Sequence, residues 1–331
     1  MVSRSGLSAC VLCAGLVSSA AVATLGGGTQ APAFRAEANV VVLSVTVTDS
    51  AGRWVPGLTA ANFSVLEDGR PRPIGQFTSD AVPISLLVVV DVSGSMQGPR
   101  FERARMAVLR LVDSLSSQDE VSVYTFNDKA HRLVDWTNEK ATTADALRTV
   151  TPSGGTALYE AVATVLDPLR DRAVRNRRDD VRRRQAVVII SDGRDHAAPS
   201  PMEGATTPDD VLFQHQAMAR TRIQRSEALL YAIGINAPNT IGRDALIDAA
   251  ALQALTDRTG GFTEVVDGGG DLVPVAERIA QELRRQYLIG FPPASLDGKF
   301  HRVKVQLKGC QGCRVRSRAG FIAEPTNRMP Q

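Results

Sequence analysis

The sequence predicts an α/β protein with a doubly wound, mostly parallel sheet, flanked by β segments that form a small β-sandwich-like domain. Three observations lead to this prediction. From 84 to 90 the chain is a continuous apolar run, which is typical of a strand buried on both faces of a parallel sheet. Helical periods and further buried runs then alternate as far as Arg285, as in open α/β sheets. Outside this part, apolar and polar residues alternate around turn sequences, which indicates short strands.

Each element of the α/β part follows from its own pattern. Helices are expected where apolar residues recur at helical spacing, and strands where a short apolar run lies between two helices. Together these elements define a domain from 83 to 286. In chain order we expect a strand at 84–90, a helix at 100–115, strands at 121–126 and 131–136, a helix at 157–169, a strand at 186–190, a helix at 211–224, a strand at 228–235, a helix at 245–256, a strand at 262–266 and a helix at 272–285.

The flanking β segments occupy 38–80 and 287–323. In the first, residues 40–48 alternate apolar and polar side chains, and Asp68-Gly69 is a hairpin-type turn. Because β segments lie on both sides of the α/β part, we expect them to pack together as one small domain with the α/β part inserted. Two separate β appendages are the alternative. The expected strands of the second segment are 287–291, 300–307 and 314–318.

The composition is that of an ordinary soluble globular protein, with 44% hydrophobic and 22% charged residues. A net charge of +3 over 331 residues is too small to indicate nucleic-acid binding. Residues 1–25 carry Arg4 and then a nearly uncharged, apolar and small-residue stretch, which predicts a secretory signal peptide. An uncleaved anchor is the alternative. We therefore expect an exported protein, periplasmic or secreted, with no stable membrane span in its mature form.

The four cysteines form two close pairs. Cys10 and Cys13 lie in the predicted signal peptide, which leaves Cys310 and Cys313. In an oxidising compartment such a pair can form a small disulfide loop. A metal site would need a further pair of Cys or His ligands at suitable spacing, and none follows. A disulfide that staples a hairpin, or two free thiols, is therefore expected.

The strongest functional signal lies where the first buried strand ends. The segment Asp91-Val92-Ser93-Gly94-Ser95-Met96 has the pattern D-x-S-x-S. In open α/β sheets, ligands bind at the carboxyl ends of the strands. Short oxygen-bearing side chains at alternate positions of a tight loop can converge on one point. Because Mg²⁺ prefers a near-octahedral shell of oxygens, the segment predicts a divalent cation site.

Two further segments complete a resemblance to the metal-ion-dependent adhesion site of the von Willebrand factor type A (VWA) family. They are Ser153-Gly154-Gly155-Thr156 and, after another buried strand, Ile189-Ile190-Ser191-Asp192-Gly193. The resemblance covers roughly 83–285, and the flanking β segments look like those of bacterial "VWFA-related" proteins. All five metal-site positions of the family are filled in this sequence, by Asp91, Ser93, Ser95, Thr156 and Asp192.

The resemblance implies a role for each of these residues. The two serines and, in the ligand-bound form, the threonine contact the metal, and the two aspartates act largely through water. Mg²⁺ is the expected cation, with Mn²⁺ or Ca²⁺ as alternatives. Neutral hydroxyls leave the charge of a cation poorly neutralised, so a carboxylate of a partner protein or envelope component can complete its shell. Gly94 and Gly155 are expected to let the loops turn tightly around the ion.

The function we expect is therefore that of an exported, metal-dependent protein-binding or adhesion module, not an enzyme. A Mg²⁺-dependent hydrolase or phosphoryl-transfer enzyme is the first alternative. Enzymes of the haloacid dehalogenase type need a second aspartate two residues after the first, where this chain has Ser93, so no general acid or base is supplied. A VWA partner subunit of an AAA+ ATPase is the second alternative. Such subunits work inside the cell, and the predicted signal peptide argues against one here.

Overall fold

The computed structural model describes most of the chain after the first 39 residues. The predicted signal peptide, with Cys10 and Cys13, lies outside the described residues. Those that are described belong to one compact unit, Phe34–Gln331. Among them, no helix combines the length and the apolar character needed to span a bilayer. The described ranges are 40–179, 182–195, 204–205, 207–236, 247–267 and 270–324.

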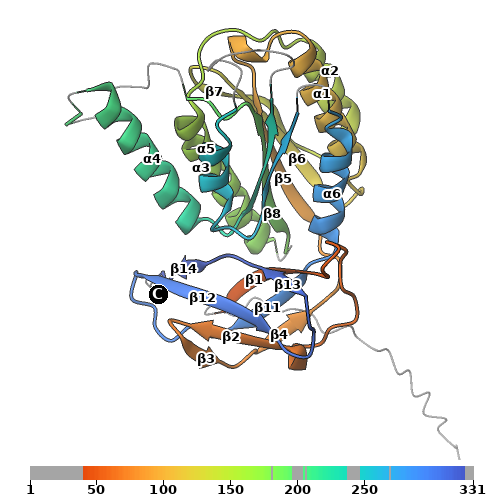
Figure 1. The fold of residues 1–331 in the computed structure, drawn as a ribbon, viewed down its shortest axis with the longest axis vertical. Coiled ribbons are helices and arrows are strands. Elements are labelled where there is room, and N and C mark those ends of the chain that lie inside the picture. Colours follow the sequence, from red (N-terminus) through yellow and green to blue (C-terminus); the bar gives the residue numbers. More distant parts are fainter. Residues whose placement is uncertain are drawn as a thin grey trace, which may run out of the picture. The chain divides into compact units, whose positions relative to one another are not determined.

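A six-stranded sheet with the order β10-β9-β8-β5-β6-β7 forms the centre of the α/β part (Figure 1). All neighbouring strands are parallel except β6 and β7, which are antiparallel. Every residue of β5, β6 and β9 is buried, which explains the mostly apolar sequences of β5 and β9. The predicted doubly wound, mostly parallel α/β fold is confirmed. The strands are β5 (Ile84–Asp91), β6 (Glu120–Phe126), β7 (Ala130–Thr137), β8 (Arg184–Ser191), β9 (Leu229–Ile235) and β10 (Thr263–Val266).

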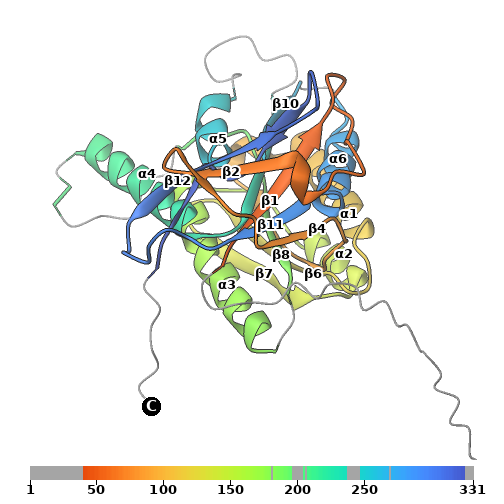
Figure 2. The same ribbon diagram turned by 90° about the horizontal axis from the view of Figure 1, so that it is seen from below.

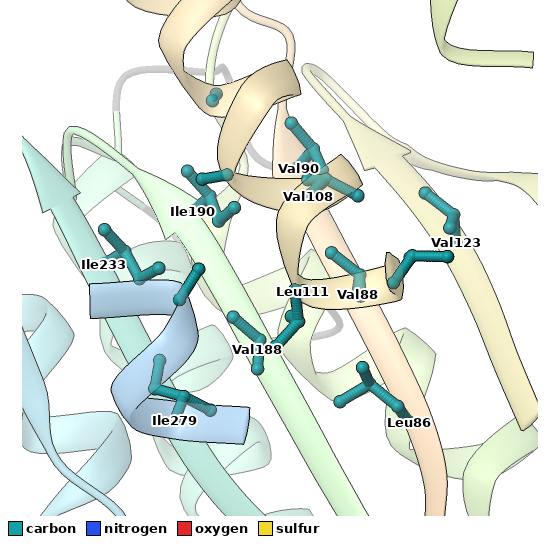
Figure 3. Packing of buried hydrophobic residues seen from close by; sticks show 14 of the residues in the cluster. Leu86, Val88, Val90, Val108, Leu111, Val123, Val188, Ile190, Ile233 and Ile279 are labelled. Carbon is teal, nitrogen blue, oxygen red and sulfur yellow. The ribbon is translucent and has the colours of Figure 1, made fainter. Parts of the chain in front are cut away.

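Helices cover both faces of this sheet. On one face, α1 (Pro99–Asp113), α2 (Lys140–Arg148) and α6 (Val273–Arg284) enclose an apolar cluster that includes Leu86 and Val88 of β5 (Figure 3). On the other, α3 (Leu158–Arg178), α4 (Pro208–Arg225) and α5 (Ala249–Thr256) enclose a second cluster with Leu87 and Val89. Successive side chains of a strand point to opposite faces, so β5 contributes to both cores.

Two helices differ from the sequence prediction. Helix α2 was not predicted, because it buries only Thr143 and Leu147 and so has no long apolar period. Helix α3 does not end at 169 but continues to Arg178, with Pro168 inside it. A proline in a helix interior loses one backbone hydrogen bond, a cost of about 3 kcal/mol. The buried side chains of Leu169 and Ala173 beyond it contribute packing that offsets this cost.

The remaining strands form two four-stranded sheets, with the orders β13-β1-β11-β4 and β14-β12-β2-β3. Strand β1 pairs with β11 and β2 pairs with β12, both antiparallel, although the whole α/β part separates them in the sequence (Figures 1 and 2). Side chains from all four of these strands share one apolar cluster. These strands are β1 (Val41–Thr48), β2 (Phe63–Glu67), β3 (Arg70–Arg72), β4 (Gln76–Thr78), β11 (Tyr287–Phe291), β12 (Phe300–Leu307), β13 (Arg314–Arg316) and β14 (Gly320–Ile322).

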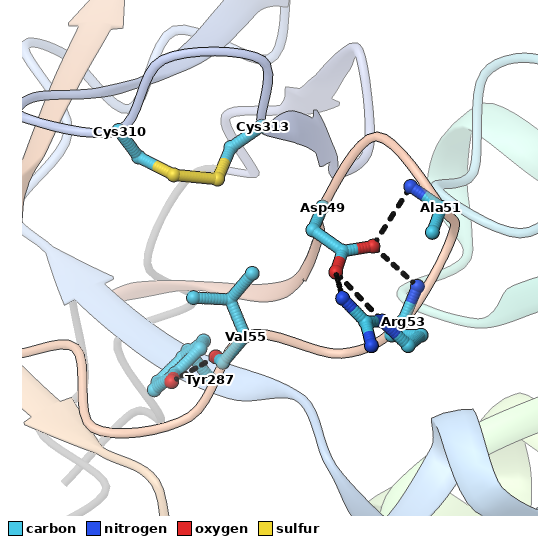
Figure 4. Close-up of a disulfide and its surroundings, with 7 residues drawn as sticks. All are labelled: Asp49, Ala51, Arg53, Val55, Tyr287, Cys310 and Cys313. Atoms are coloured by element: carbon cyan, nitrogen blue, oxygen red, sulfur yellow. Dashed lines mark hydrogen bonds and ion pairs between the residues drawn. A yellow bond between two sulfur atoms is a disulfide. The ribbon is translucent and has the colours of Figure 1, made fainter.

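A disulfide joins Cys310 and Cys313 in the loop between β12 and β13 (Figure 4). Of the two states that the sequence left open, the structure therefore has the disulfide. Tyr287 of β11 donates a hydrogen bond of 2.7 Å to the carbonyl oxygen of Val55, which attaches the chain after β1 to the sheet (Figure 4).

Candidate cation site

The predicted metal-binding residues lie on loops at one edge of the central sheet. Strands β5 and β8 are parallel neighbours, so their carboxyl ends lie side by side. Asp91 is the last residue of β5, Asp192 directly follows β8, and Thr156 lies just before α3. Side chains at these three positions and at Ser93 are buried, and Ser95 is half-buried.

Backbone hydrogen bonds attach the second motif to the first. The amide of Gly94 donates to the carbonyl oxygen of Gly154 at 3.0 Å, and the amide of Ser153 donates to that of Val92 at 2.7 Å. The loop that carries Thr156 is therefore held against the loop that carries Ser93 and Ser95. All three motifs, which are far apart in the sequence, meet at this edge.

Asp91 is fully buried, and each of its carboxylate oxygens has a separate partner. Oδ1 accepts a hydrogen bond of 2.9 Å from the amide of Ser93, and Oδ2 accepts one of 2.6 Å from Oγ of Ser191. Burial raises the pKa of Asp91 to about 7, and the nearby charge of Asp192 acts in the same direction. A cation beside this carboxylate would favour its charged form.

The hydroxyls of the first motif point toward one another, with Oγ of Ser93 and Oγ of Ser95 3.0 Å apart. Two oxygen donors at this separation can face one small cation. Both are neutral, so they contribute lone pairs without neutralising charge. The donor set of the site would therefore be hydroxyl oxygens, supported by two carboxylates.

Asp192 has one satisfied and one unsatisfied oxygen. Oδ1 accepts a hydrogen bond of 3.2 Å from the amide of Arg194. Oδ2 is buried and accepts no hydrogen bond from any described residue. The guanidinium nitrogens nearest to it are Nη1 of Arg100 at 3.6 Å and Nε of Arg194 at 3.9 Å. These two ion pairs offset part of the cost of burying this oxygen, which can still accept a hydrogen bond from water or from an ion-bound water.

Sequence reasoning missed three residues that support the site. Ser191 holds Asp91, and Arg100 donates from Nη1 to the carbonyl oxygen of Ser95 at 2.6 Å while lying near Asp192. Asp128 accepts a hydrogen bond of 3.0 Å from the amide of Gly155 through Oδ1. A signal for Asp128 was present, because it follows β6, whose carboxyl end lies at the same edge as that of β5.

The expectation for the glycines was wrong in detail. Neither Gly94 nor Gly155 has a positive φ, whereas Gly154 has φ +83° and Gly193 has φ +77°. A Cβ at Gly154 would lie 2.6 Å from Oδ2 of Asp128. The tight turns are therefore made by the neighbouring glycine of the second motif and by the glycine after Asp192, because only glycine adopts this backbone conformation readily.

The chemistry of these donors suits a hard cation. In the described part of the chain, no group of three or more His, Cys, Asp or Glu side chains has a metal-binding arrangement. The candidate donors are all oxygens, whereas zinc and similar metals prefer nitrogen or sulfur ligands. The oxygens of Ser93, Ser95, Thr156 and the two aspartates fit Mg²⁺, Mn²⁺ or Ca²⁺.

The part of the chain that contains the candidate cation site is similar in sequence to known proteins. Residues 86–194 match the family model of the von Willebrand factor type A domain, and this segment contains all five predicted metal-site residues. Inter-alpha-trypsin inhibitor heavy chain H2 of Mus musculus is 27% identical over 232 residues, which are 66% of this chain and 22% of that protein. The protein of the same name from Homo sapiens is 32% identical over 229 residues, with the same two shares.

The chain thus spans about a fifth of the length of the curated relatives that it matches, 22% in both cases. A solved von Willebrand factor type A structure from Catenulispora acidiphila is 13% identical, with a TM-score of 0.46. The match covers 87% of this chain and 75% of the Catenulispora acidiphila chain. The family match supports the VWA resemblance of the α/β part, and the fold is a VWA-like α/β fold.

Proposed function

We propose that this protein is an exported binding module that holds a divalent cation beside Asp91 and uses it to bind a carboxylate of a partner protein or envelope component. VWA domains are typically protein-interaction or adhesion modules, and residues 86–194 match that family. The single observation that carries the metal dependence is the convergence of three separate loops on two buried carboxylates and a pair of hydroxyls.

Burial of the two carboxylates supports a cation more than an empty polar cluster. Asp91 and Asp192 have exposed fractions of 0% and 1%. Charged groups are costly to remove from water unless they are paired. A cation would offset this cost for Asp91 and would give Oδ2 of Asp192 an ion or an ion-bound water as a partner.

The charge of the site favours an acidic ligand. Ser93, Ser95 and Thr156 would supply only neutral oxygens, and the two carboxylates already have hydrogen-bond or ion-pair contacts to Ser191, Arg100 and Arg194. A divalent cation there keeps part of its charge, so a carboxylate from outside is the natural last ligand. Mg²⁺ supplies that attraction when bound, and the protein's own residues orient the donors.

Catalysis has less support. Asp91 accepts a hydrogen bond from the amide of Ser93, Arg100 donates one to the carbonyl oxygen of Ser95, and the two serine hydroxyls lie within hydrogen-bond distance of each other. A nucleophilic serine needs an adjacent general base that is itself oriented by a third group. Asp91 is engaged by Ser191 and by a backbone amide, which suits a role in positioning.

Isothermal titration of the purified, metal-free protein with Mg²⁺, Mn²⁺ and Ca²⁺ tests the cation site. We expect the wild type to bind at least one of them at a single site, and Asp91→Ala and Ser93→Ala to lose most of that affinity. Asp145→Asn is the matched control, because Asp145 pairs with Arg148 at an exposed position of α2. Failure of the wild type to bind any of the three cations would overturn the proposal.

Capture from an envelope extract tests the partner. Immobilised wild-type protein should retain a partner in Mg²⁺ and release it in EDTA, whereas Asp91→Ala should retain little in either buffer. Equal retention in both buffers would show that binding does not depend on the cation. Cell fractionation checks export, since a cytoplasmic location would contradict the predicted signal peptide.

A further inference from the structure

Two cavities with a common wall lie between α3, α4 and the C-terminal β segment. The first has a volume of about 200 Å³ and is lined also by Gln185 at the start of β8, so it lies at the edge of the sheet opposite the candidate cation site. The second has a volume of about 450 Å³ and lies between α3 and α4. The residues common to both are Leu166, Arg170, Arg225 and Ser226.

Arginines dominate the charge of these cavities. Two of the five that line them have an acidic partner: Arg222 pairs with Asp167, and Arg177 lies 3.6 Å from Glu227. Within the described ranges, the other three have no carboxylate within 4 Å. The lining arginines are Arg170, Arg177, Arg222, Arg225 and Arg318, and the lining carboxylates are Asp167, Glu227 and Glu324.

Arg318 is half-buried, and the acceptors of its hydrogen bonds to described residues are neutral. Nε donates to the carbonyl oxygen of Gly320 at 2.6 Å, and Nη2 donates to that of Gln224 at 3.4 Å. Burial lowers the pKa of Arg318, and the charge of Glu227 opposes this only in part. A guanidinium that has lost part of its hydration is stabilised by an anion.

Arg170 and Arg225 provide two more cationic groups where the cavities meet. Both are exposed, and they come from facing helices, α3 and α4. A guanidinium presents two parallel N–H groups that match the two oxygens of a carboxylate. Leu166, Leu169 and Phe321 add an apolar part to the lining, which suits a ligand with a short carbon chain.

We propose that the joined cavities form an anion site for a ligand that carries two or more carboxylates on a short carbon framework. Such a ligand is either a small polycarboxylate or an acidic peptide. The combined cavities lie within the size of ordinary ligand pockets, roughly 300–1,000 Å³. This site is independent of the cation site and of the function proposed for it.

Titration of metal-free protein tests this site without any contribution from bound metal, in a chelator-free buffer from which a resin has removed divalent cations. The probes are citrate, as a small polycarboxylate, and acetyl-Glu-Glu-Glu-amide, as an acidic peptide; acetyl-Gln-Gln-Gln-amide is the neutral control. The wild type should bind at least one acidic probe at a single site and should not bind the neutral peptide. Binding of citrate alone or of the acidic peptide alone supports the site. It also shows whether the ligand is a small polycarboxylate or an acidic peptide.

Two variants test the residues. Arg170→Gln/Arg225→Gln should weaken the bound probe at least tenfold, and Arg318→Gln should do the same. Arg220→Gln on α4 is the control, because Arg220 is exposed but does not line either cavity. If Arg318→Gln does not fold, the double variant, which changes only exposed side chains, decides. Absence of binding by both acidic probes, or unchanged affinity in the double variant, would overturn the proposal.

Discussion

Oγ of Ser191, the last residue of β8, donates a hydrogen bond of 2.6 Å to Oδ2 of Asp91, the last residue of β5. Both residues are fully buried. The bond joins the ends of two adjacent parallel strands and orients the carboxylate on which the proposed cation site depends. Because the amide of Ser93 holds the other oxygen, Asp91 has little rotational freedom.

Ser191→Ala should therefore weaken cation binding as well as folding. Loss of the hydroxyl leaves a buried carboxylate oxygen unsatisfied, which costs about 1–3 kcal/mol of unfolding free energy. We also expect a several-fold loss of Mg²⁺ affinity by isothermal titration. Ser85→Ala is the matched control, because Ser85 on β5, the strand of Asp91, donates a hydrogen bond of 2.6 Å to buried Glu120. An equal loss of Mg²⁺ affinity in both variants would contradict the role of Ser191.

Gly154→Ala should disturb the second loop of the site. At φ +83°, an added Cβ would lie 2.6 Å from Oδ2 of Asp128 and 3.1 Å from Nδ2 of Asn127. These side chains cannot move without loss of their hydrogen bonds to Gly155 and Ser153. Cation affinity should fall at least fivefold, as measured by isothermal titration.

The control for this prediction is Gly98→Ala. Gly98 also has a positive φ, +71°, but an added Cβ meets nothing within 4 Å. Both substitutions carry the strain of a positive φ, which residues with a Cβ rarely adopt, and only that at Gly154 carries the collision. If Gly98→Ala lowers cation affinity as much as Gly154→Ala does, the collision with Asp128 is not the cause.

Glu282 of α6 joins the α/β part to the β domain. It accepts hydrogen bonds from Tyr231 Oη at 2.9 Å and Thr46 Oγ1 at 3.2 Å, and it pairs with Arg316 of β13. Because its side chain is only 10% exposed, Glu282→Ala should lower the unfolding free energy by roughly 2–4 kcal/mol. Urea denaturation followed by circular dichroism measures the loss.

Glu277→Ala, on the same helix, provides the comparison. Glu277 pairs with Arg110 at 2.6 Å, but its side chain is 37% exposed and that of Arg110 is 54% exposed. An exposed pair of this kind contributes at most about 1 kcal/mol. A loss at Glu277 as large as that at Glu282 would show that burial of the Glu282 contacts is not what stabilises the junction.

His301 of β12 should make the stability of the β domain dependent on pH. Nε2 lies 3.0 Å from Oδ1 of Asp297, and Nδ1 lies 2.7 Å from Oδ2 of Asp68. The hydrogen bond to Asp297 contributes most to raising the pKa of His301 above 6.5, and the contact with Asp68 adds to it. The pKa of Asp297 is lowered mainly by its hydrogen bond to His301, and that of Asp68 mainly by the backbone amide of Arg302, with His301 adding to it.

The direction of the pH effect follows from these shifts. The contribution of His301 is complete below pH 6.5 and is lost as the pH rises through its higher folded pKa, whereas that of the aspartates is lost only as the pH falls below about 3.8. Urea midpoints should therefore fall more between pH 6 and pH 8.5 for the wild type than for His301→Gln. His131→Gln, at an exposed position of β7, is the control and should keep the pH dependence of the wild-type urea midpoint. The same pH dependence in His301→Gln would contradict the role of His301.

The elements of the α/β part were predictable because each has a local cause. A strand buried on both faces, such as β5, is apolar at most of its positions, and a helix such as α1 shows the spacing of its buried face. The approximate place of the candidate site was predictable for the same reason, since Asp91 and Asp192 come directly after two such strands. Helix α2, with two buried residues, left no comparable pattern.

By itself, the sequence determined most helices and strands of the α/β part and their order, the doubly wound α/β class and the three segments at strand and loop ends. Periodicity and local composition record which faces of these elements are buried. Only the tertiary structure decided that β1 pairs with β11, and that Ser191 and Arg100 contact the candidate site. These contacts depend on where the backbone brings distant residues and on the direction of each side chain. Neither is recorded in the spacing of residues along the chain.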